Sequence, residues 1–205
     1  MTTESTSFDW RTRLKSSIKL NQDDPHFRFI QMATVTSKGE PRNRTIVFRG
    51  FDDDQESLLF CTDRRSRKVD ELSLFQSVEL CWYFLKSREQ YRLNGSVQFV
   101  QKAQKVDQIW SQLSSQSKAQ FYWPTPRARV LATTNETSEI YTQTIEGRQA
   151  PKRQPLDFKE STYPSNFLVM KVVIKTVDYL VLSNTHQRFV CRQASTGWES
   201  IEVNP

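Results

Sequence analysis

Cysteine is scarce in this chain, and its few copies lie far apart. The 205 residues contain only Cys61, Cys81 and Cys191, an odd number with no CxxC pair. This spacing argues against a disulfide framework or a zinc site and is typical of a reducing compartment. We therefore expect a cytoplasmic protein without a metal centre.

Membrane and secretion signals are also missing. No apolar run approaches the roughly 18 residues that a membrane helix needs. The polar start, residues 1–9, lacks the apolar centre of a signal peptide. Internal repeats and recognised nucleic-acid-binding motifs are absent as well, so we expect neither a membrane nor a nucleic-acid partner. The length fits a single domain over residues 1–205.

Positive charge is what the chain has in excess, with a formal net charge of +6. Scattered basic residues are usually a solvated surface, and a solvated basic turn is the simplest reading of 64–68 too. However, four of those five residues are basic, and they lie where a polar turn leads into helical spacing at Val69, Leu72 and Phe75. Ser66 stands at the expected helix start, where a serine can cap backbone N–H groups. A helix start carrying Arg67 and Lys68 can instead hold a phosphate.

Short strands dominate the rest of the pattern. Apolar alternation or β-rich composition predicts strands at 27–35, 43–51, 58–62, 78–85, 90–100, 167–182, 188–192 and 199–203. Helical spacing predicts helices at 8–20 (within an N-terminal segment 1–22), from 66 onward, at 102–113 and at 115–123. Residues 133–165 are polar and proline-containing and read as a long loop or insertion. We expect a mostly β fold with inserted helices, closed into an antiparallel barrel.

Two strands carry more specific expectations. Residues 27–35 place Phe27, Phe29, Ala33 and Val35 on one side. In 90–100, polar Gln90 alternates with apolar neighbours, as in a half-buried antiparallel strand. Gly95 in the middle of that strand predicts a bulge or a close backbone approach.

Four motifs together resemble the pyridoxamine 5'-phosphate oxidase family of FMN-binding split barrels. Residues 44–49 (Arg-Thr-Ile-Val-Phe-Arg) are similar to the family's Arg-x-Val-x-x-Lys strand, with Arg49 replacing the lysine. Thr62 followed by Ser66-Arg67-Lys68 resembles its Thr-Asn-x-x-Ser-Arg-Lys segment. Residues 88–95 resemble its Arg-Gln-Val-x-Val-x-Gly strand, and residues 186–188 its His-Asp-Arg. Each motif alone is weak, but their order and spacing match.

The resemblance implies FMN as the cofactor and a set of residues around it. Arg44, Ser66, Arg67 and Lys68 would surround the FMN phosphate and ribityl chain, with Thr62 at the phosphate end. The backbone of Thr45, Ile46 and Val47 would line the flavin ring, and Gln90 would hydrogen-bond it. Arg188 would reach the ring from the second subunit of a homodimer. Arg49 is a further cofactor contact, although five residues along a regular strand from Arg44 it points to the opposite face.

The substrate half departs from the family pattern. Leu180 stands where the family's oxidases have a tryptophan. Asn184 stands where they have an arginine, and Glu202 where they have a basic residue. Arg49, Arg127 and His186 remain as candidate contacts for a small-molecule substrate. We expect an FMN-dependent oxidoreductase whose substrate is not pyridoxamine 5'-phosphate and which needs no catalytic side chain of its own. The alternative is a non-catalytic FMN-binding or carrier module.

Overall fold

A computed structural model describes residues 8–127 and 162–205. The strands are β1 (Phe29–Val35), β2 (Pro41–Phe51), β3 (Leu58–Asp63), β4 (Ser77–Phe84), β5 (Glu89–Phe99), β6 (Phe167–Val181), β7 (Gln187–Ala194) and β8 (Gly197–Val203). The helices are α1 (Trp10–Leu20), α2 (Arg67–Leu74), α3 (Ala103–Ser111), α4 (Ser115–Ala119) and the 3-10 turn η1 (Gln120–Tyr122).

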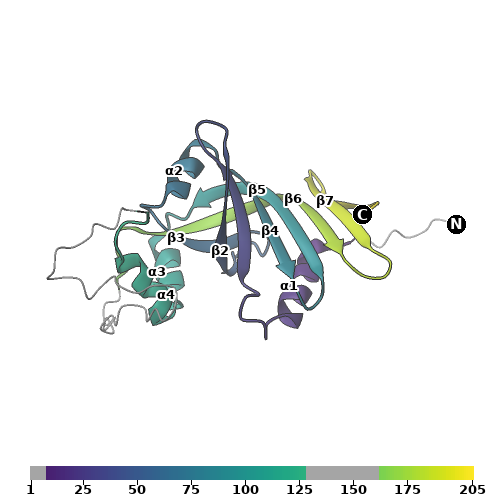
Figure 1. The fold of residues 1–205 in the computed structure, drawn as a ribbon, viewed down its shortest axis with the longest axis horizontal. Coiled ribbons are helices and arrows are strands. Elements are labelled where there is room, and N and C mark those ends of the chain that lie inside the picture. The colour runs from purple at the N-terminus through teal and green to yellow at the C-terminus, as the bar shows by residue number, and fades with distance from the viewer. Residues whose placement is uncertain (1–7, 128–161) are drawn as a thin grey trace, which may run out of the picture.

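All the strands belong to one antiparallel sheet in the order β3-β2-β1-β4-β5-β6-β7-β8. A second pairing joins β3 to β6, from Leu58 opposite Val172 to Asp63 opposite Phe167. This pairing closes β1 to β6 into a barrel, while β7 and β8 continue from β6 as a projecting hairpin (Figure 1). The predicted mostly β fold with an antiparallel barrel is therefore confirmed.

The predicted elements are present, with most ends shifted by one or two residues. The helix predicted at 115–123 is shorter, because α4 ends at Ala119 and the chain continues as the 3-10 turn η1. The loop predicted at 133–165 falls almost wholly on residues outside the described ranges. Among the helices that are described, none is long and apolar enough to cross a membrane.

The main core fills the barrel and extends under α1. The side chain of Asp9 caps this helix by accepting a hydrogen bond from the N–H of Arg11. Trp10 and Leu14, one turn apart on the same helix face, are fully buried in the main cluster. The ring of Trp10 meets that of Trp198 from β8 edge to face at 5.1 Å. Apolar burial of this size is the principal stabilising term in such a fold.

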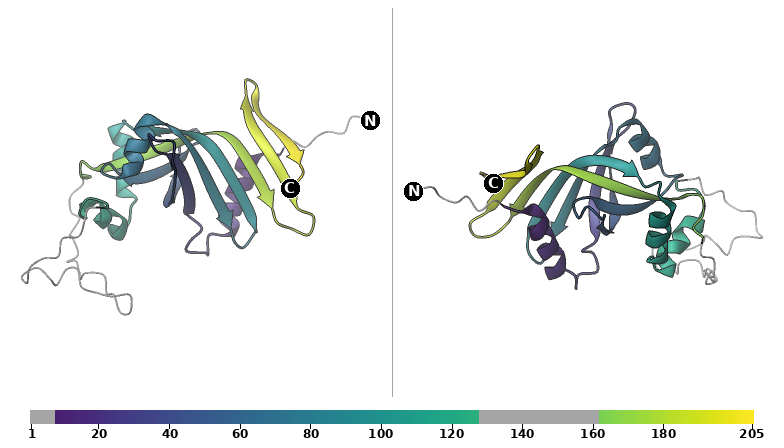
Figure 2. Two further views of the ribbon diagram at one scale, coloured as in Figure 1. Left: turned by 45° about the horizontal axis from the view of Figure 1, so that its top comes forward. Right: turned by 180° about the vertical axis from the view of Figure 1, so that it is seen from behind.

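A second core lies outside the barrel, against β3 and β6. Trp110 of α3, Phe121 of η1 and Phe167 of β6 form a triangle of edge-to-face rings, with centroids 4.8–5.9 Å apart. Figure 2 shows α3 and α4 gathered at this end of the sheet, with the β7–β8 hairpin at the other. The second core therefore packs against β3 and the start of β6, next to the loop that leads from β3 into α2.

Strand β1 buries the side opposite to its aromatic residues. Ile30, Met32 and Thr34 face the core, whereas Phe29 and Val35 remain 44% and 38% exposed. Both sides of this strand are largely apolar, so alternation alone does not say which side is inside. The outer face of the sheet thus carries apolar side chains that the described part of the chain leaves uncovered.

Candidate functional site

The start of α2 is the centre of the candidate site. Ser66 occupies the N-cap position with an extended backbone (φ −85°, ψ 137°) but makes no side-chain capping bond. Its hydroxyl instead accepts a hydrogen bond from Lys68 Nζ at 2.7 Å. The capping role predicted for Ser66 is therefore not seen. The N–H of Val69 donates to the carbonyl of Ser66 at 2.9 Å. The N–H groups of Arg67 and Lys68, at the first two positions of α2, have no side-chain cap and remain suited to an anion.

Lys68 ties the helix start to the end of β3. Its Nζ also donates to Thr62 Oγ1 at 2.9 Å, and Thr62 is buried. Burial lowers the pKa of Lys68, and the nearby positive charge of Arg44 lowers it further, although Asp63 and Glu71 oppose the shift. A half-buried lysine whose charge is disfavoured in this way gains from a bound anion.

Arg44 approaches the same helix from β2. Its Nη2 donates to Glu71 Oε2 at 2.6 Å, and its Nη1 donates to Thr34 Oγ1 and to the carbonyl of Met32. The structure thus brings Arg44, Thr62, Ser66 and Lys68 together, as expected. Arg67 is exposed beside them, at the first position of α2.

The other basic residues of this loop hold it in place. Arg65 forms a two-pronged ion pair with Asp63, with its Nη2 2.6 Å from Oδ2, and also donates to the carbonyl of Trp123 at 3.0 Å. Asn166 donates to both Asp63 and the carbonyl of Phe121, each at 2.8 Å. Asp63 and Arg65 therefore join the loop between β3 and α2 to the second core.

Arg49 lies apart from this group. A register shift in β2 between Phe48 and Gly50 places Arg49 at a bulge, and its guanidinium lies beside Cys61. Burial raises the pKa of the Cys61 thiol to about 12, in spite of the opposing charge of Arg49. The Nε of Arg49 is buried and has no hydrogen-bond partner among the described residues. Without a ligand, Arg44 and Arg49 therefore contact different residues: Arg44 contacts Glu71, and Arg49 lies beside Cys61.

The segment between these arginines alternates as a strand should. Thr45 is exposed and hydrogen-bonds Gln31 at 3.0 Å, Ile46 points into the core, and Val47 is half-buried. The side chains of Thr45 and Val47 therefore lie on the outer face of the sheet. Only the backbone of Ile46 is available to a ligand on that face.

Gln90 and Arg188 share a row on the outer face of the sheet. Leu180 pairs with Gln90 on one side and with Arg188 on the other. Neighbouring strands lie about 4.8 Å apart, so the two positions are separated by roughly 10 Å. Asp178 holds the Arg188 guanidinium through two bonds of 2.9 and 2.7 Å. Within one chain, Arg188 is thus turned toward Asp178.

The candidate substrate residues are not gathered in one place by the described chain. Arg127 is exposed after η1 and has a positive φ of 64°. His186 is exposed in the turn between β6 and β7. Among the described residues, no hydrogen bond or ion pair joins Arg49, Arg127 or His186 to one another.

Thr34 and Glu71 are residues that the sequence patterns did not single out. Both are buried, and the hydroxyl of Thr34 donates to Glu71 Oε2 at 2.5 Å. Glu71 stands four residues after Arg67 on α2, a spacing typical of an exposed ion pair on a helix surface. That pattern concealed its role as a partner of Arg44.

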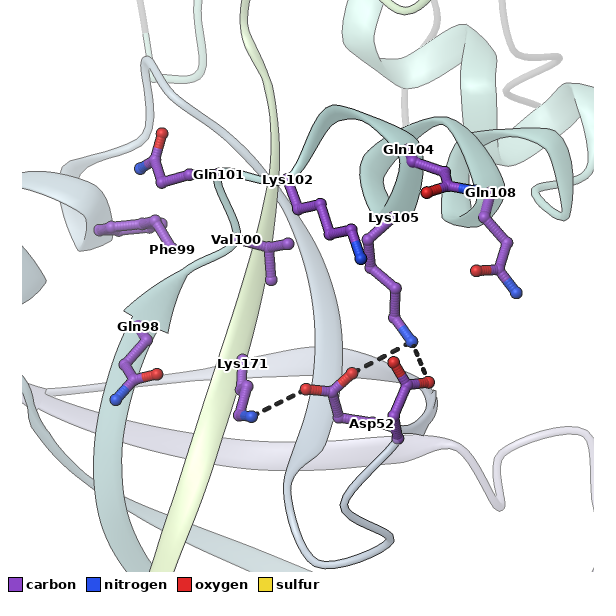
Figure 3. A pocket seen from close by; sticks show the side chains of 11 residues that line it. Asp52, Gln98, Phe99, Val100, Gln101, Lys102, Gln104, Lys105, Gln108 and Lys171 are labelled. Atoms are coloured by element: carbon purple, nitrogen blue, oxygen red, sulfur yellow. Dashed lines mark hydrogen bonds and ion pairs between the residues drawn. The ribbon is translucent and has the colours of Figure 1, made fainter.

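An open pocket of about 470 Å³ lies elsewhere, between the end of β5, α3 and the β2–β3 loop. In Figure 3, Lys105 and Lys171 both point toward Asp52, which they contact at 3.1 and 2.8 Å. Lys105 also contacts Asp53 at 2.7 Å. These lysines and aspartates neutralise one another, and none of the predicted site residues lines the pocket.

Comparison with known proteins gives consistent results. Residues 7–101 match the family model described as "Pyridoxamine 5'-phosphate oxidase, FMN-binding domain". Pyridoxine/pyridoxamine 5'-phosphate oxidase 2 of Arabidopsis thaliana is 31% identical over 208 residues, covering 96% of each protein.

Solved structures show the same fold. A pyridoxamine 5'-phosphate oxidase-related, FMN-binding protein of Nostoc punctiforme superposes with a TM-score of 0.79 at 28% identity, covering 98% of this chain and 99% of that one. PhzG of Burkholderia lata, solved with tetrahydrophenazine-1-carboxylic acid, gives a TM-score of 0.71 at 17% identity, with 95% and 90% coverage. At that identity the second match speaks for the fold alone.

Proposed function

Because this chain belongs to the pyridoxamine 5'-phosphate oxidase family of FMN-binding proteins, we propose that it is an FMN-dependent oxidoreductase. The observation that carries the proposal is the cationic cluster at the start of α2. Arg44, Arg67 and Lys68 meet there beside uncapped helix N–H groups. All three lie within the residues that match the FMN-binding domain.

The chemistry of this cluster fits the phosphate end of FMN. A phosphate monoester carries close to two negative charges at neutral pH. Arginine, lysine and helix-start N–H groups are the donors that such a group prefers. Burial, together with the positive charge of Arg44, lowers the pKa of Lys68, and a bound dianion would offset both effects. Thr62 and Ser66 add hydroxyls that hold the Lys68 amine in place.

We assign the flavin ring to the outer face of the sheet. FMN, when bound, supplies the electron-transfer chemistry, and the protein binds and orients it. The backbone of Thr45 to Val47 would lie along the ring, and the Gln90 amide would offer it both a donor and an acceptor. Arg188 would come from the other subunit, which requires it to loosen its ion pair with Asp178.

A homodimer is part of the proposal. Phe29, Val35 and Tyr83 are each at least 38% exposed on β1 and β4, whose other sides pack into the core. Apolar side chains gathered on one exposed sheet face are typical of an interaction surface. A second copy of the chain would cover them and bring its Arg188 toward the ring. The three free cysteines support the cytoplasmic location that we expect.

A flavin titration tests cofactor binding. We expect Arg67→Ala combined with Lys68→Ala to raise the Kd for FMN at least 100-fold, because each charge-assisted contact is worth about 1.5–3 kcal/mol. Lys19→Ala with Lys38→Ala removes the same charge from exposed positions and should leave the Kd within about twofold. Equal affinity of the wild type and the first double variant would place the phosphate elsewhere.

The substrate is proposed to differ from pyridoxamine 5'-phosphate. In the resemblance to the family, Asn184 stands in place of an arginine that helps to hold the vitamin substrate, and Thr125 stands where another arginine is expected. Both residues are exposed. Two lost contacts of about 1.5–3 kcal/mol each correspond to about two to four powers of ten in kcat/KM. We expect the FMN-loaded protein to oxidise pyridoxamine 5'-phosphate with kcat/KM well below about 10⁴ M⁻¹s⁻¹, the low end for ordinary enzymes. A higher kcat/KM refutes the proposal that the substrate is a different one. If no electron donor reduces the bound flavin and no acceptor reoxidises it, the alternative of a non-catalytic FMN carrier is favoured.

A further inference from the structure

A buried carboxylate lies inside the cationic cluster. Glu71 is the fifth residue of α2, is 8% exposed, and turns toward β1 and β2. Its Oε2 accepts from Arg44 Nη2 at 2.6 Å and from Thr34 Oγ1 at 2.5 Å. A negative charge is unexpected in a site for a dianion, because it repels the ligand that the cations attract. Its position therefore requires an explanation.

The contacts of Glu71 fix the orientation of Arg44. The Nη2 of Arg44 is held by Glu71, while its Nη1 is held by Thr34 and by the Met32 carbonyl at 3.3 Å. The Nε of Arg44 has no hydrogen bond to a described residue, and it is not among the buried unpartnered atoms. One edge of the guanidinium is thus anchored, and the Nε edge remains open to a ligand. A planar guanidinium with a free edge can bind phosphate through two parallel bonds.

Glu71 also acts on the second cation of the cluster. The positive charge of Arg44 lowers the pKa of Lys68, and the negative charge of Glu71 raises it. Without Glu71, two partly buried cations would face each other with less compensation. The carboxylate therefore favours the charged form of Lys68 before the anion arrives.

We propose that Glu71 is a positioning residue for the phosphate group of the flavin, acting through Arg44. Thr34 completes the support by bridging Glu71 and Arg44. The negative charge of Glu71 weakens the attraction of the site for anions in general. Its hydrogen bond, however, holds Arg44 in one orientation, with the Nε edge open to the phosphate. This inference rests on the proposed FMN site and adds a residue that acts on the phosphate end of the ligand alone.

The test compares two ligands that differ only in the phosphate. FMN and riboflavin share the flavin ring and the ribityl chain, so a residue that acts through Arg44 should affect FMN only. We expect Glu71→Gln to raise the Kd for FMN about tenfold, the order found for coupled contacts. The Kd for riboflavin should stay within about twofold. Quenching of flavin fluorescence measures both constants without an assay of turnover.

A neighbouring residue provides a matched control. Asp70→Asn makes the same change of charge one position earlier on α2, where the side chain is exposed. It should leave the FMN Kd within about twofold. In an Arg44→Ala background, Glu71→Gln should have no further effect, because the residue through which it acts is gone. Thr34→Val should reproduce the selective loss of FMN affinity, and it serves as the test if Glu71→Gln does not fold.

Several results would overturn the inference. An equal loss of FMN and riboflavin affinity would assign Glu71 a structural role only. Tighter FMN binding by Glu71→Gln would mean that the carboxylate merely repels phosphate. An unchanged effect in the Arg44→Ala background would show that Glu71 does not act through Arg44. A wild-type protein that binds no FMN would refute the proposed function together with this inference, whereas FMN binding that Glu71→Gln does not alter refutes the inference alone.

Discussion

Gly95 stands where β5 and β6 approach too closely for any side chain. A Cβ built on Gly95 would lie 2.2 Å from the carbonyl oxygen of Val173 and 3.2 Å from the Cα of Ile174. Tolerated contacts between carbon and carbonyl oxygen are about 3.3–3.6 Å, so the strands would have to separate by about 1 Å. The obstructing atoms belong to the backbone and cannot rotate away. The register shifts at this same point, between Asn94 and Gly95.

We expect Gly95→Ala to lower the free energy of unfolding by about 3 kcal/mol, the upper part of the range for overpacked sites. For a chain of this size, that corresponds to a fall in Tm of about 6–12 °C. The sign of the change in the free energy of unfolding tests the argument. Replacing glycine by alanine where the backbone tolerates it stabilises a protein by about 0.4–1 kcal/mol.

Urea unfolding followed by tryptophan fluorescence measures this change, because Trp82 is fully buried in the barrel core. Ser96→Ala, at the next position of the same strand, should change the free energy of unfolding by less than about 0.5 kcal/mol. An unchanged or higher midpoint for Gly95→Ala would mean that β5 and β6 are farther apart than described, and the reasoning would fail.

Two further predictions concern the cofactor site and the dimer. The affinity for FMN should rise as the phosphate ionises near pH 6, and fall again as Lys68 loses its proton. Because burial and Arg44 lower the pKa of Lys68, that fall should begin at a lower pH than for an exposed lysine, while riboflavin affinity stays flat. Sedimentation should give a dimer of the 24.1 kDa chain at micromolar concentration, and Phe29→Asp with Tyr83→Asp should convert it to monomer; a wild-type monomer with FMN bound would contradict the shared site.

Local features of the fold could be predicted from the sequence, because each depends on neighbours in the chain. The alternation after Gln90 predicted β5, and Gly95 within it predicted a bulge or a close backbone approach; the structure has both a register shift and a close approach there. The start of α2 was predicted from Ser66 and the apolar spacing behind it. These signals reflect periodicity and backbone sterics, which act over a few residues.

Longer-range features could not be predicted in this way. The buried side of β1 was ambiguous because Ile30 and Phe29 are both apolar, and only packing against the barrel decides between them. The role of Glu71 could not be predicted because its partners, Thr34 and Arg44, lie on other elements. Strand alternation already predicted that Arg44 and Arg49 point to opposite faces, but the register shift beside Arg49 was not predicted.

The pairing of β3 with β6 has a consequence for how the chain folds. It joins residues 58–63 to residues 167–172, whereas the β1–β2 and β4–β5 pairs are hairpins between adjacent segments. Closing so long a loop costs chain entropy before any contact repays it, and contacts of this kind slow folding. The β1–β2 and β4–β5 hairpins therefore form early, and the seam between β3 and β6 closes late.

The loop between β3 and α2 directly follows the β3 side of that seam. Arg64, at the end of β3, donates its backbone N–H to the carbonyl of Asn166, just before β6 begins. The seam is a second hold on this loop, because β3 also pairs with β2, the strand that carries Arg44. We expect a ligand that bridges Arg44 and Lys68 to favour the closed barrel and so to slow unfolding.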